Sequence, residues 1–182
     1  MPELRDGPAS SLPGNRTGAT VREVKSPTTP RRNNASRRCI KYNLQFVTHN
    51  VRGIQTPQKR EQLVEWAKSQ NIYAMCMQET WIPAQDKTFS IGDHVIINHG
   101  IQTAANGRTR KGVAILLSPI AYKSWIRSGS IMMTYGDRVI AIELKLPNKH
   151  VARIISGYAP DSSYSETDRV HYQDSLHEAI AA

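Results

Sequence analysis

The stretch Asn-Ile-Tyr-Ala-Met-Cys-Met-Gln-Glu-Thr, residues 71–80, decides how the rest of the chain is interpreted. Its apolar run, residues 72–77, has the length of a strand and ends at a polar triplet, residues 78–80. Short apolar runs of this kind are typical of strands in sheets covered on both faces. Glu79 is then expected at the carboxyl end of the strand, where α/β sheets place their sites. A carboxylate there can bind Mg²⁺, which prefers oxygen ligands and often takes only one or two carboxylates. The alternative is a strand-end Glu that merely faces solvent.

The residues before this stretch complete a strand–helix–strand unit. Residues 40–48 alternate apolar and polar side chains, as a half-buried strand does, and lead into His-Asn-Val-Arg-Gly at residues 49–53. Residues 56–70 begin with Thr-Pro, an N-cap followed by proline at the first helical position, and predict a helix. Strands joined by such a crossover are expected to be parallel. Asn50 and Glu79 should therefore lie at the same edge of the sheet.

The rest of the chain predicts further strands and one late helix. The expected strands are residues 94–98, 112–118, 122–128, 130–135, 138–146 and 151–158, and the expected helix is residues 167–182. Residues 80–93 are expected to form a loop. The order is strand, helix, strand, several antiparallel strands and a helix, which indicates a mixed α/β (α+β) fold with a largely antiparallel sheet.

Composition separates a basic tail from a folded part. The chain has 182 residues and a formal net charge of +9, and its first 39 residues hold eight basic and three acidic side chains but almost no large apolar ones. Residues 1–39 are therefore predicted to be a disordered tail, ahead of one domain at residues 40–182. Such excess positive charge suits a polyanionic partner, although a solvated linker or leader is equally open for the tail.

Neither a membrane segment nor a disulfide framework is predicted. No apolar run approaches the ~20 residues that a membrane helix needs, and the N-terminus lacks the apolar segment of a secretory signal. We therefore expect an intracellular protein, with the nucleus as one option because of the basic tail. Of the two cysteines, Cys76 lies inside the apolar run and is expected to be a buried, inert thiol.

Three motifs follow strand ends in a fixed order. They are His-Asn-Val-Arg-Gly at residues 49–53, Gln-Glu-Thr at residues 78–80 and Gly-Tyr-Ala-Pro at residues 157–160. With Gly-Val-Ala-Ile-Leu at residues 112–116 between them, they resemble the endonuclease/exonuclease/phosphatase superfamily. The closest likeness is to the apurinic-type endonuclease domain of non-LTR (LINE-type) retrotransposons. The resemblance covers about residues 42–182 and implies the N-terminal part of a four-layer sandwich, in which two mostly antiparallel sheets are flanked by helices.

The resemblance also implies the roles of three side chains. Glu79 would bind the divalent metal, Mg²⁺ or Mn²⁺, Asn50 would hydrogen-bond near the scissile phosphate, and the Tyr158 hydroxyl would point into the phosphate site. Phosphodiester hydrolysis passes through a transition state whose negative charge must be stabilised, which is the task of a metal and of fixed donors. Without the resemblance, Asn50 is a turn residue and Tyr158 a half-buried aromatic at a strand end.

Basic side chains near these motifs are expected to contact DNA phosphates. The candidates are Arg52, Arg108, Arg110 and Lys111. A solvated loop is the alternative for the last three. Some repair-type relatives carry Asp where Arg52 stands, as a further metal-site group, so this position favours the retrotransposon branch. DNA is thus the expected partner of a monomer that uses no membrane and no small-molecule cofactor.

Two later motifs of the family do not follow Tyr158. One is a Gly-Asp-Phe-Asn-like segment, whose Asp and Asn handle the nucleophile, and the other is a Ser-Asp-His segment, whose His contacts the phosphate. Losing a general base alone typically lowers the rate by ~10²–10⁴. The chain is therefore predicted to be an N-terminal fragment of a DNA endonuclease, inactive as given, with the second part of the fold missing. A non-catalytic nucleic-acid-binding remnant and a phosphatase-type member of the superfamily are the alternatives.

Overall fold

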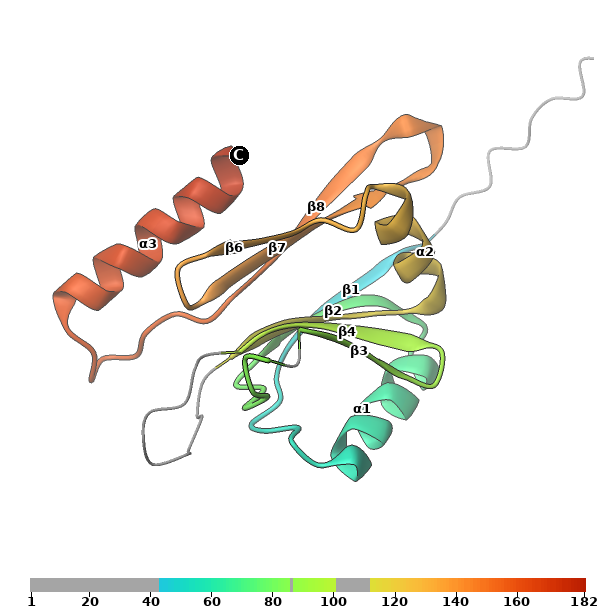
Figure 1. Cartoon of the computed structure of the whole chain (residues 1–182), viewed down its shortest axis with the longest axis horizontal. Helices are drawn as coiled ribbons and strands as arrows, with labels where there is room; N and C mark the ends of the chain where they lie inside the picture. Colours follow the sequence, from blue (N-terminus) through green and yellow to red (C-terminus); the bar gives the residue numbers. More distant parts are fainter. Residues whose placement is uncertain (1–42, 86, 101–111) are drawn as a thin grey trace, which may run out of the picture. The chain divides into compact units, whose positions relative to one another are not determined.

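The computed structural model describes residues 43–85, 87–100 and 112–182, and builds them into two sheets and three α-helices (Figure 1). The predicted tail at residues 1–39 lies outside the described residues, as do Arg108, Arg110 and Lys111. Among the described residues, no helix is long and apolar enough to cross a membrane.

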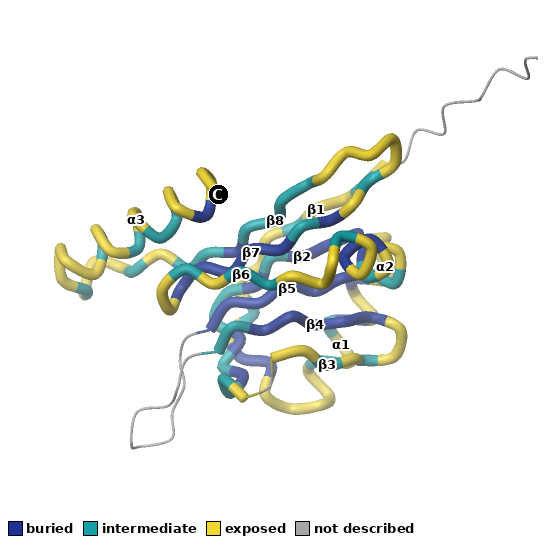
Figure 2. Tube along the Cα trace, turned by 45° about the horizontal axis from the view of Figure 1, so that its top comes forward, coloured by how far each residue is buried: buried dark blue, intermediate teal, exposed yellow. Residues whose placement is uncertain are grey.

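The first sheet has five strands in the order β1-β2-β5-β4-β3. Their bounds are β1 Gln45–Asn50, β2 Ile72–Gln78, β3 Thr88–Ile91, β4 His94–His99 and β5 Val113–Leu117. β1 and β2 are parallel, as predicted from the helix that joins them, and every other pair in the sheet is antiparallel. The central strands are buried on both faces, and β1 is an exposed edge (Figure 2).

Helix α1, Pro57–Ser69, covers one face of this sheet. It begins as the sequence predicts, because the Thr56 hydroxyl accepts a hydrogen bond from the Lys59 amide at 3.4 Å and Pro57 follows the cap. Its buried side chains, Val64 and Ala67, pack with a set of apolar residues from β2, β4 and β5: Ile72, Met75, Met77, Ile96, Ala114 and Leu116.

The second sheet has three antiparallel strands in the order β6-β7-β8. Their bounds are β6 Met132–Tyr135, β7 Val139–Lys145 and β8 Val151–Gly157, and the short 3-10 helix η1, Pro147–Lys149, joins the last two. On β7, Ile140, Ile142 and Leu144 face the first sheet and form a second core with its side chains. Helix α2, Pro119–Arg127, packs Ala121 and Trp125 into the same core.

Helix α3, Glu166–Ala181, packs against the other face of the second sheet (Figure 1). Arg153, whose cross-strand partner is Glu143, donates from Nη1 to the carbonyl of Ala179 at 3.4 Å. The layers are therefore α1, the five-stranded sheet, the three-stranded sheet and α3. The predicted mixed fold of two mostly antiparallel sheets flanked by helices is confirmed.

Three local predictions were wrong. Of residues 122–128, expected as a strand, all but the C-cap Ser128 belong to α2, because Ser118 caps a helix by accepting from the Ala121 amide at 3.3 Å and Pro119 opens it. Residues 80–93, expected as a loop, contain β3, which pairs with β4. Within the described residues, the strand predicted at residues 40–48 begins only at Gln45 and runs on to Asn50.

Candidate active site

The parallel pairing of β1 and β2 continues beyond both strand ends. Asn50 lies opposite Gln78 in the register, and the Gly53 amide donates to the Glu79 carbonyl at 2.7 Å. The turn after β1 is therefore tied to the residues that follow β2. This tie holds the side chain of Asn50 next to that of Glu79, at the edge where the sequence predicts them.

Two hydrogen-bond donors meet on one oxygen of Glu79. Its Oε1 accepts from Asn50 Nδ2 at 2.7 Å and from the Tyr158 hydroxyl at 3.0 Å. The Asn50 Oδ1 accepts in turn from the Arg52 amide at 3.2 Å, which turns the Nδ2 group toward the carboxylate. The three predicted residues thus form one hydrogen-bonded group, although Asn50 lies 29 positions and Tyr158 79 positions from Glu79 in the sequence.

Tyr158 reaches this group from the second sheet. It follows β8, and its amide donates to the carbonyl of Arg138 at 3.0 Å, which extends the β7–β8 pairing by one residue. Burial raises the pKa of the Tyr158 phenol above its ordinary value, and the hydrogen bond and negative charge of Glu79 raise it further. At neutral pH the phenol is therefore an O–H donor.

The backbone around the carboxylate is strained. Glu79 has a φ of +53°, Arg52 one of +46° and Trp81 one of +56°, all in the left-handed region. A side chain in this region costs roughly 1–2 kcal/mol for each residue. Such strain clusters at functional sites, where the surrounding structure holds it in place. Here the absence of a side chain at Gly53 allows the ring of Trp81 to pack directly on the turn, since a Cβ at that position would overlap the six-membered ring of Trp81.

The group is open to solvent. Asn50 is exposed, and Glu79 and Tyr158 are partly exposed, whereas Thr80 next to the carboxylate is completely buried. The Thr80 amide donates to the Gly112 carbonyl at 3.3 Å, which fixes the turn after β2 to β5. A polar ligand can therefore approach Glu79 from one side while the buried residues keep the carboxylate in place.

The residues present fit a hard cation that keeps most of its waters. Across the described part of the chain, no three His, Cys, Asp or Glu side chains lie close enough together to hold a metal ion. An ion at Glu79 would thus have one carboxylate, as Mg²⁺ commonly does, and not the closed set of ligands that structural zinc requires. Asp161, three residues after Tyr158, instead bonds within its own turn. Its carboxylate accepts hydrogen bonds from the hydroxyl and amide of Ser163 at 2.6 and 2.8 Å, and these bonds lower the pKa of Asp161.

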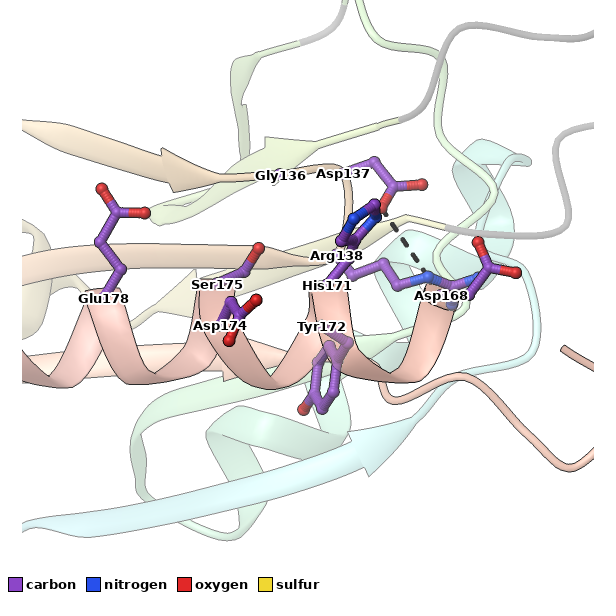
Figure 3. Close-up of a pocket in the computed structure, with 9 residues that line it drawn as sticks. All are labelled: Gly136, Asp137, Arg138, Asp168, His171, Tyr172, Asp174, Ser175 and Glu178. Atoms are coloured by element: carbon purple, nitrogen blue, oxygen red, sulfur yellow. Dashed lines mark ion pairs between the residues drawn. The ribbon is translucent and has the colours of Figure 1, made fainter. Parts of the chain in front are cut away.

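Among the cavities lined by described residues, two lie near this region, and Glu79 is not part of the lining of either. A groove of about 510 Å³ between β1 and α1 contains His49 and Trp66, whose rings lie 5.9 Å apart. A cavity of about 380 Å³ lies between the β6–β7 turn and α3 (Figure 3). Its carboxylates are those of Asp137, Asp168, Asp174 and Glu178.

Of the predicted DNA contacts, the structure describes only Arg52, an exposed residue two positions after Asn50. Sequence reasoning missed Arg138, whose buried side chain lies beneath Tyr158. The only sign of Arg138 in the sequence is its position, as a basic residue immediately before a strongly alternating strand. No model of a known protein family matches the chain.

Proposed function

We propose that Glu79, Asn50 and Tyr158 belong to the phosphodiester-cleaving site of a divalent-metal-dependent DNA endonuclease of the retrotransposon type. The observation that carries this proposal is the meeting of two donors from different sheets on one carboxylate oxygen of the partly exposed Glu79. The left-handed backbone of Glu79 and the resemblance of the three motifs support it, as does the net charge of +9, which suits DNA.

Each residue has a defined task in this proposal. Glu79 would hold Mg²⁺ or Mn²⁺, and the ion when bound supplies polarisation of a phosphoryl oxygen and charge for the leaving oxygen. With the ion on Glu79, the second hydrogen of Asn50 Nδ2 would donate to a phosphate oxygen, and the Tyr158 hydroxyl would turn its single hydrogen from Glu79 to another phosphate oxygen. Fixed donors of this kind are each worth ~10²-fold or more in rate, by analogy with oxyanion holes. Arg52 would contact a neighbouring phosphate, which positions DNA without reading its sequence.

Activation of the nucleophile needs residues that these motifs do not provide. The family's Gly-Asp-Phe-Asn-like and Ser-Asp-His segments do not occur after Tyr158. We expect turnover only in a chain that also carries them, since loss of the base alone lowers rates by ~10²–10⁴. The 182 residues should bind the ion and DNA but should not cleave.

The test is plasmid nicking in Mg²⁺ by this chain and by the chain extended with its natural downstream sequence. We expect nicking by the extended chain only, and a loss of at least about 100-fold in Glu79→Gln. Glu178→Gln, an exposed glutamate on α3, removes the same charge elsewhere and should leave nicking unchanged. Nicking that survives Glu79→Gln would overturn the role of Glu79.

The net charge favours one alternative, a non-catalytic module that binds nucleic acid through charge alone. It predicts DNA binding that weakens steeply with salt, no nicking by either chain, and no response to Glu79→Gln. A phosphatase-type activity would instead appear as hydrolysis of a phosphomonoester by the extended chain. Parallel assays with p-nitrophenyl phosphate and bis(p-nitrophenyl) phosphate separate monoester from diester cleavage.

A further inference from the structure

Arg138 is a buried cation directly behind the candidate site. The residue is 6% exposed, at a position where an arginine needs partners to offset its desolvation. Its Nη1 donates to the carbonyl of Tyr158 at 3.4 Å. The centre of its guanidinium lies 5.7 Å from the ring centroid of Tyr158 and 4.5 Å from that of Tyr164. It thus contacts both ends of the segment that follows β8.

Its acidic neighbour does not explain this position. Asp137 is exposed, and its Oδ1 lies 3.7 Å from the Arg138 Nε, which is an ion pair but too long for a hydrogen bond. Figure 3 shows this pair at the edge of the cavity beside α3, with Asp168 and His171 of the helix nearby. Because its carboxylate is exposed, Asp137 offsets little of the desolvation of the guanidinium. The guanidinium lies against the rings of Tyr158 and Tyr164, and its charge also helps to lower the pKa of Asp161 in the same segment.

We propose that Arg138 is a positioning residue for Tyr158, and that its guanidinium clamps residues 158–164 so that the Tyr158 hydroxyl reaches Glu79. Three contacts hold Tyr158. Its amide donates a hydrogen bond to the Arg138 carbonyl, its carbonyl accepts one from Arg138 Nη1, and its ring lies over the guanidinium. The first contact is between backbone atoms and should survive a change of side chain at position 138, whereas the other two depend on the arginine side chain. The importance of this clamp for catalysis rests on the function proposed above, but the clamp itself does not.

The geometry requires arginine and not merely a positive charge. A guanidinium is planar, so it can stack on aromatic rings while it donates in its own plane to a carbonyl. A lysine ammonium keeps the charge but cannot make both contacts in this arrangement. Arg138→Lys should therefore retain part of the side-chain positioning, and Arg138→Met, which keeps an unbranched stem without the charge or the donors, should retain only the backbone hydrogen bond.

The first measurement is amide hydrogen exchange across residues 158–164, with crystal structures of the same variants. Val64→Ala is the control, because Val64 belongs to α1 and is buried against the far face of the first sheet, so its truncation lowers stability without touching the clamp. At matched global stability, Arg138→Met should exchange at least tenfold faster than Val64→Ala in this segment and lose the contact between Tyr158 and Glu79. Arg138→Lys should fall between the two.

Equal protection in Arg138→Met and Val64→Ala, with the contact between Tyr158 and Glu79 kept, would overturn the proposal. If Arg138→Met does not fold, the same comparison is made with Arg138→Lys. Protection in Arg138→Lys that equals that of Val64→Ala then has the same meaning.

The second measurement is a double-mutant cycle in the extended, nicking-competent chain. If Arg138 acts through the Tyr158 hydroxyl, Arg138→Met and Tyr158→Phe should each lower kcat with little change in KM, and the double variant should be no slower than the slower single one. Additive losses would mean that Arg138 supports the fold alone, and would reject the clamp. Absence of nicking by the extended wild-type chain would defeat the proposed function instead, and the exchange experiment would still test the clamp.

Discussion

Two strands of the same sheet differ sharply in burial. All five residues of β5 are buried, whereas none of the six residues of β1 is (Figure 2). The cause is their place in the sheet, since β5 lies between β2 and β4 and β1 lies at the edge. The central strands therefore stabilise the fold, whereas the candidate site lies where the strands leave the buried core.

The position of the carboxylate follows from the same difference. Glu79 directly follows β2, a strand that pairs with the buried β5 on one side and with the exposed β1 on the other, and its carboxylate accepts from Asn50 of β1. A carboxylate in the middle of the sheet would lose its water and carry a large desolvation cost. At the edge it is fixed on one side and reachable on the other. Core substitutions should therefore change folding, and substitutions at the strand ends should change binding.

The largest expected effect separates the two strands directly. Val113→Ala in β5 should lower the free energy of unfolding by about 1.5–3 kcal/mol, because Val113 is 1% exposed. Val47→Ala in β1 deletes the same atoms from a partly exposed site and should lower it by less than about half as much. Urea denaturation of both variants measures the difference. Equal losses would mean that β1 is as buried in solution as β5.

The next effect concerns the turn that carries the site. Gly53 and Gly92 both have positive φ, so alanine strains the backbone at either position. At Gly53 the new methyl group would also overlap the ring of Trp81, whereas at Gly92 the nearest atom is Lys68 Nζ at 3.8 Å. Gly53→Ala should therefore cost about 1–3 kcal/mol more than Gly92→Ala in urea denaturation. A similar cost for both would show that the turn after β1 is loosely packed.

A smaller effect is expected for Glu79→Gly. Glycine relieves the strain of the left-handed backbone. It also loses more conformational entropy on folding and removes two hydrogen bonds at an open site, so the free energy of unfolding should change by no more than about 1 kcal/mol. Mn²⁺ affinity, measured by titration calorimetry, should nevertheless fall by at least about tenfold, because the carboxylate ligand is lost. A loss of stability above about 2 kcal/mol, with Mn²⁺ binding unchanged, would make Glu79 a structural tie and not a ligand.

The smallest effect is on the chemistry of a thiol between the two sheets. Burial raises the pKa of Cys76, and its Sγ lies 3.5 Å from the carbonyl of Ile155 on β8. In a Cys39→Ser variant, Cys76 should react with iodoacetamide at pH 8 more slowly than after unfolding in urea, because less of it is thiolate.

The same shift has a consequence for stability. Because the folded state holds the Cys76 proton more tightly than the unfolded state, this thiol should lower stability as the pH rises above its ordinary pKa. A Cys76→Ser comparison by thermal unfolding between pH 7 and pH 10 checks the sign. Equal reactivity before and after unfolding would contradict the packing of the two sheets.

Sequence reasoning could place part of the site for a physical reason. A strand–helix–strand unit makes β1 and β2 parallel, so Asn50 and Glu79 had to end at one edge. Tyr158 belongs to the second sheet, and no pattern within the chain states how two sheets face each other. Its place beside Glu79 was therefore expected only from the family resemblance. Arg138 gave only a weak signal, its place before an alternating strand, because its partners come from strand pairing and from a segment 20 or more residues later.

The wrong predictions have local causes. The predicted strand at residues 122–128 rests on a loosely alternating pattern, but Ser118 and Pro119 start a helix, and the capping signal outweighs that pattern. β3 has only four residues and is stabilised by pairing with β4, so its own sequence carries little information. Strong periodicity and caps could be predicted, whereas elements that depend on a neighbour could not.

The most direct test of the central claim is the anomalous difference map of a crystal of this chain soaked in Mn²⁺. The account predicts one peak about 2 Å from a carboxylate oxygen of Glu79, with the Asn50 amide and the Tyr158 hydroxyl facing the same space. A map with Mn²⁺ bound at other carboxylates, while Glu79 still accepts only from Asn50 and Tyr158, would contradict it.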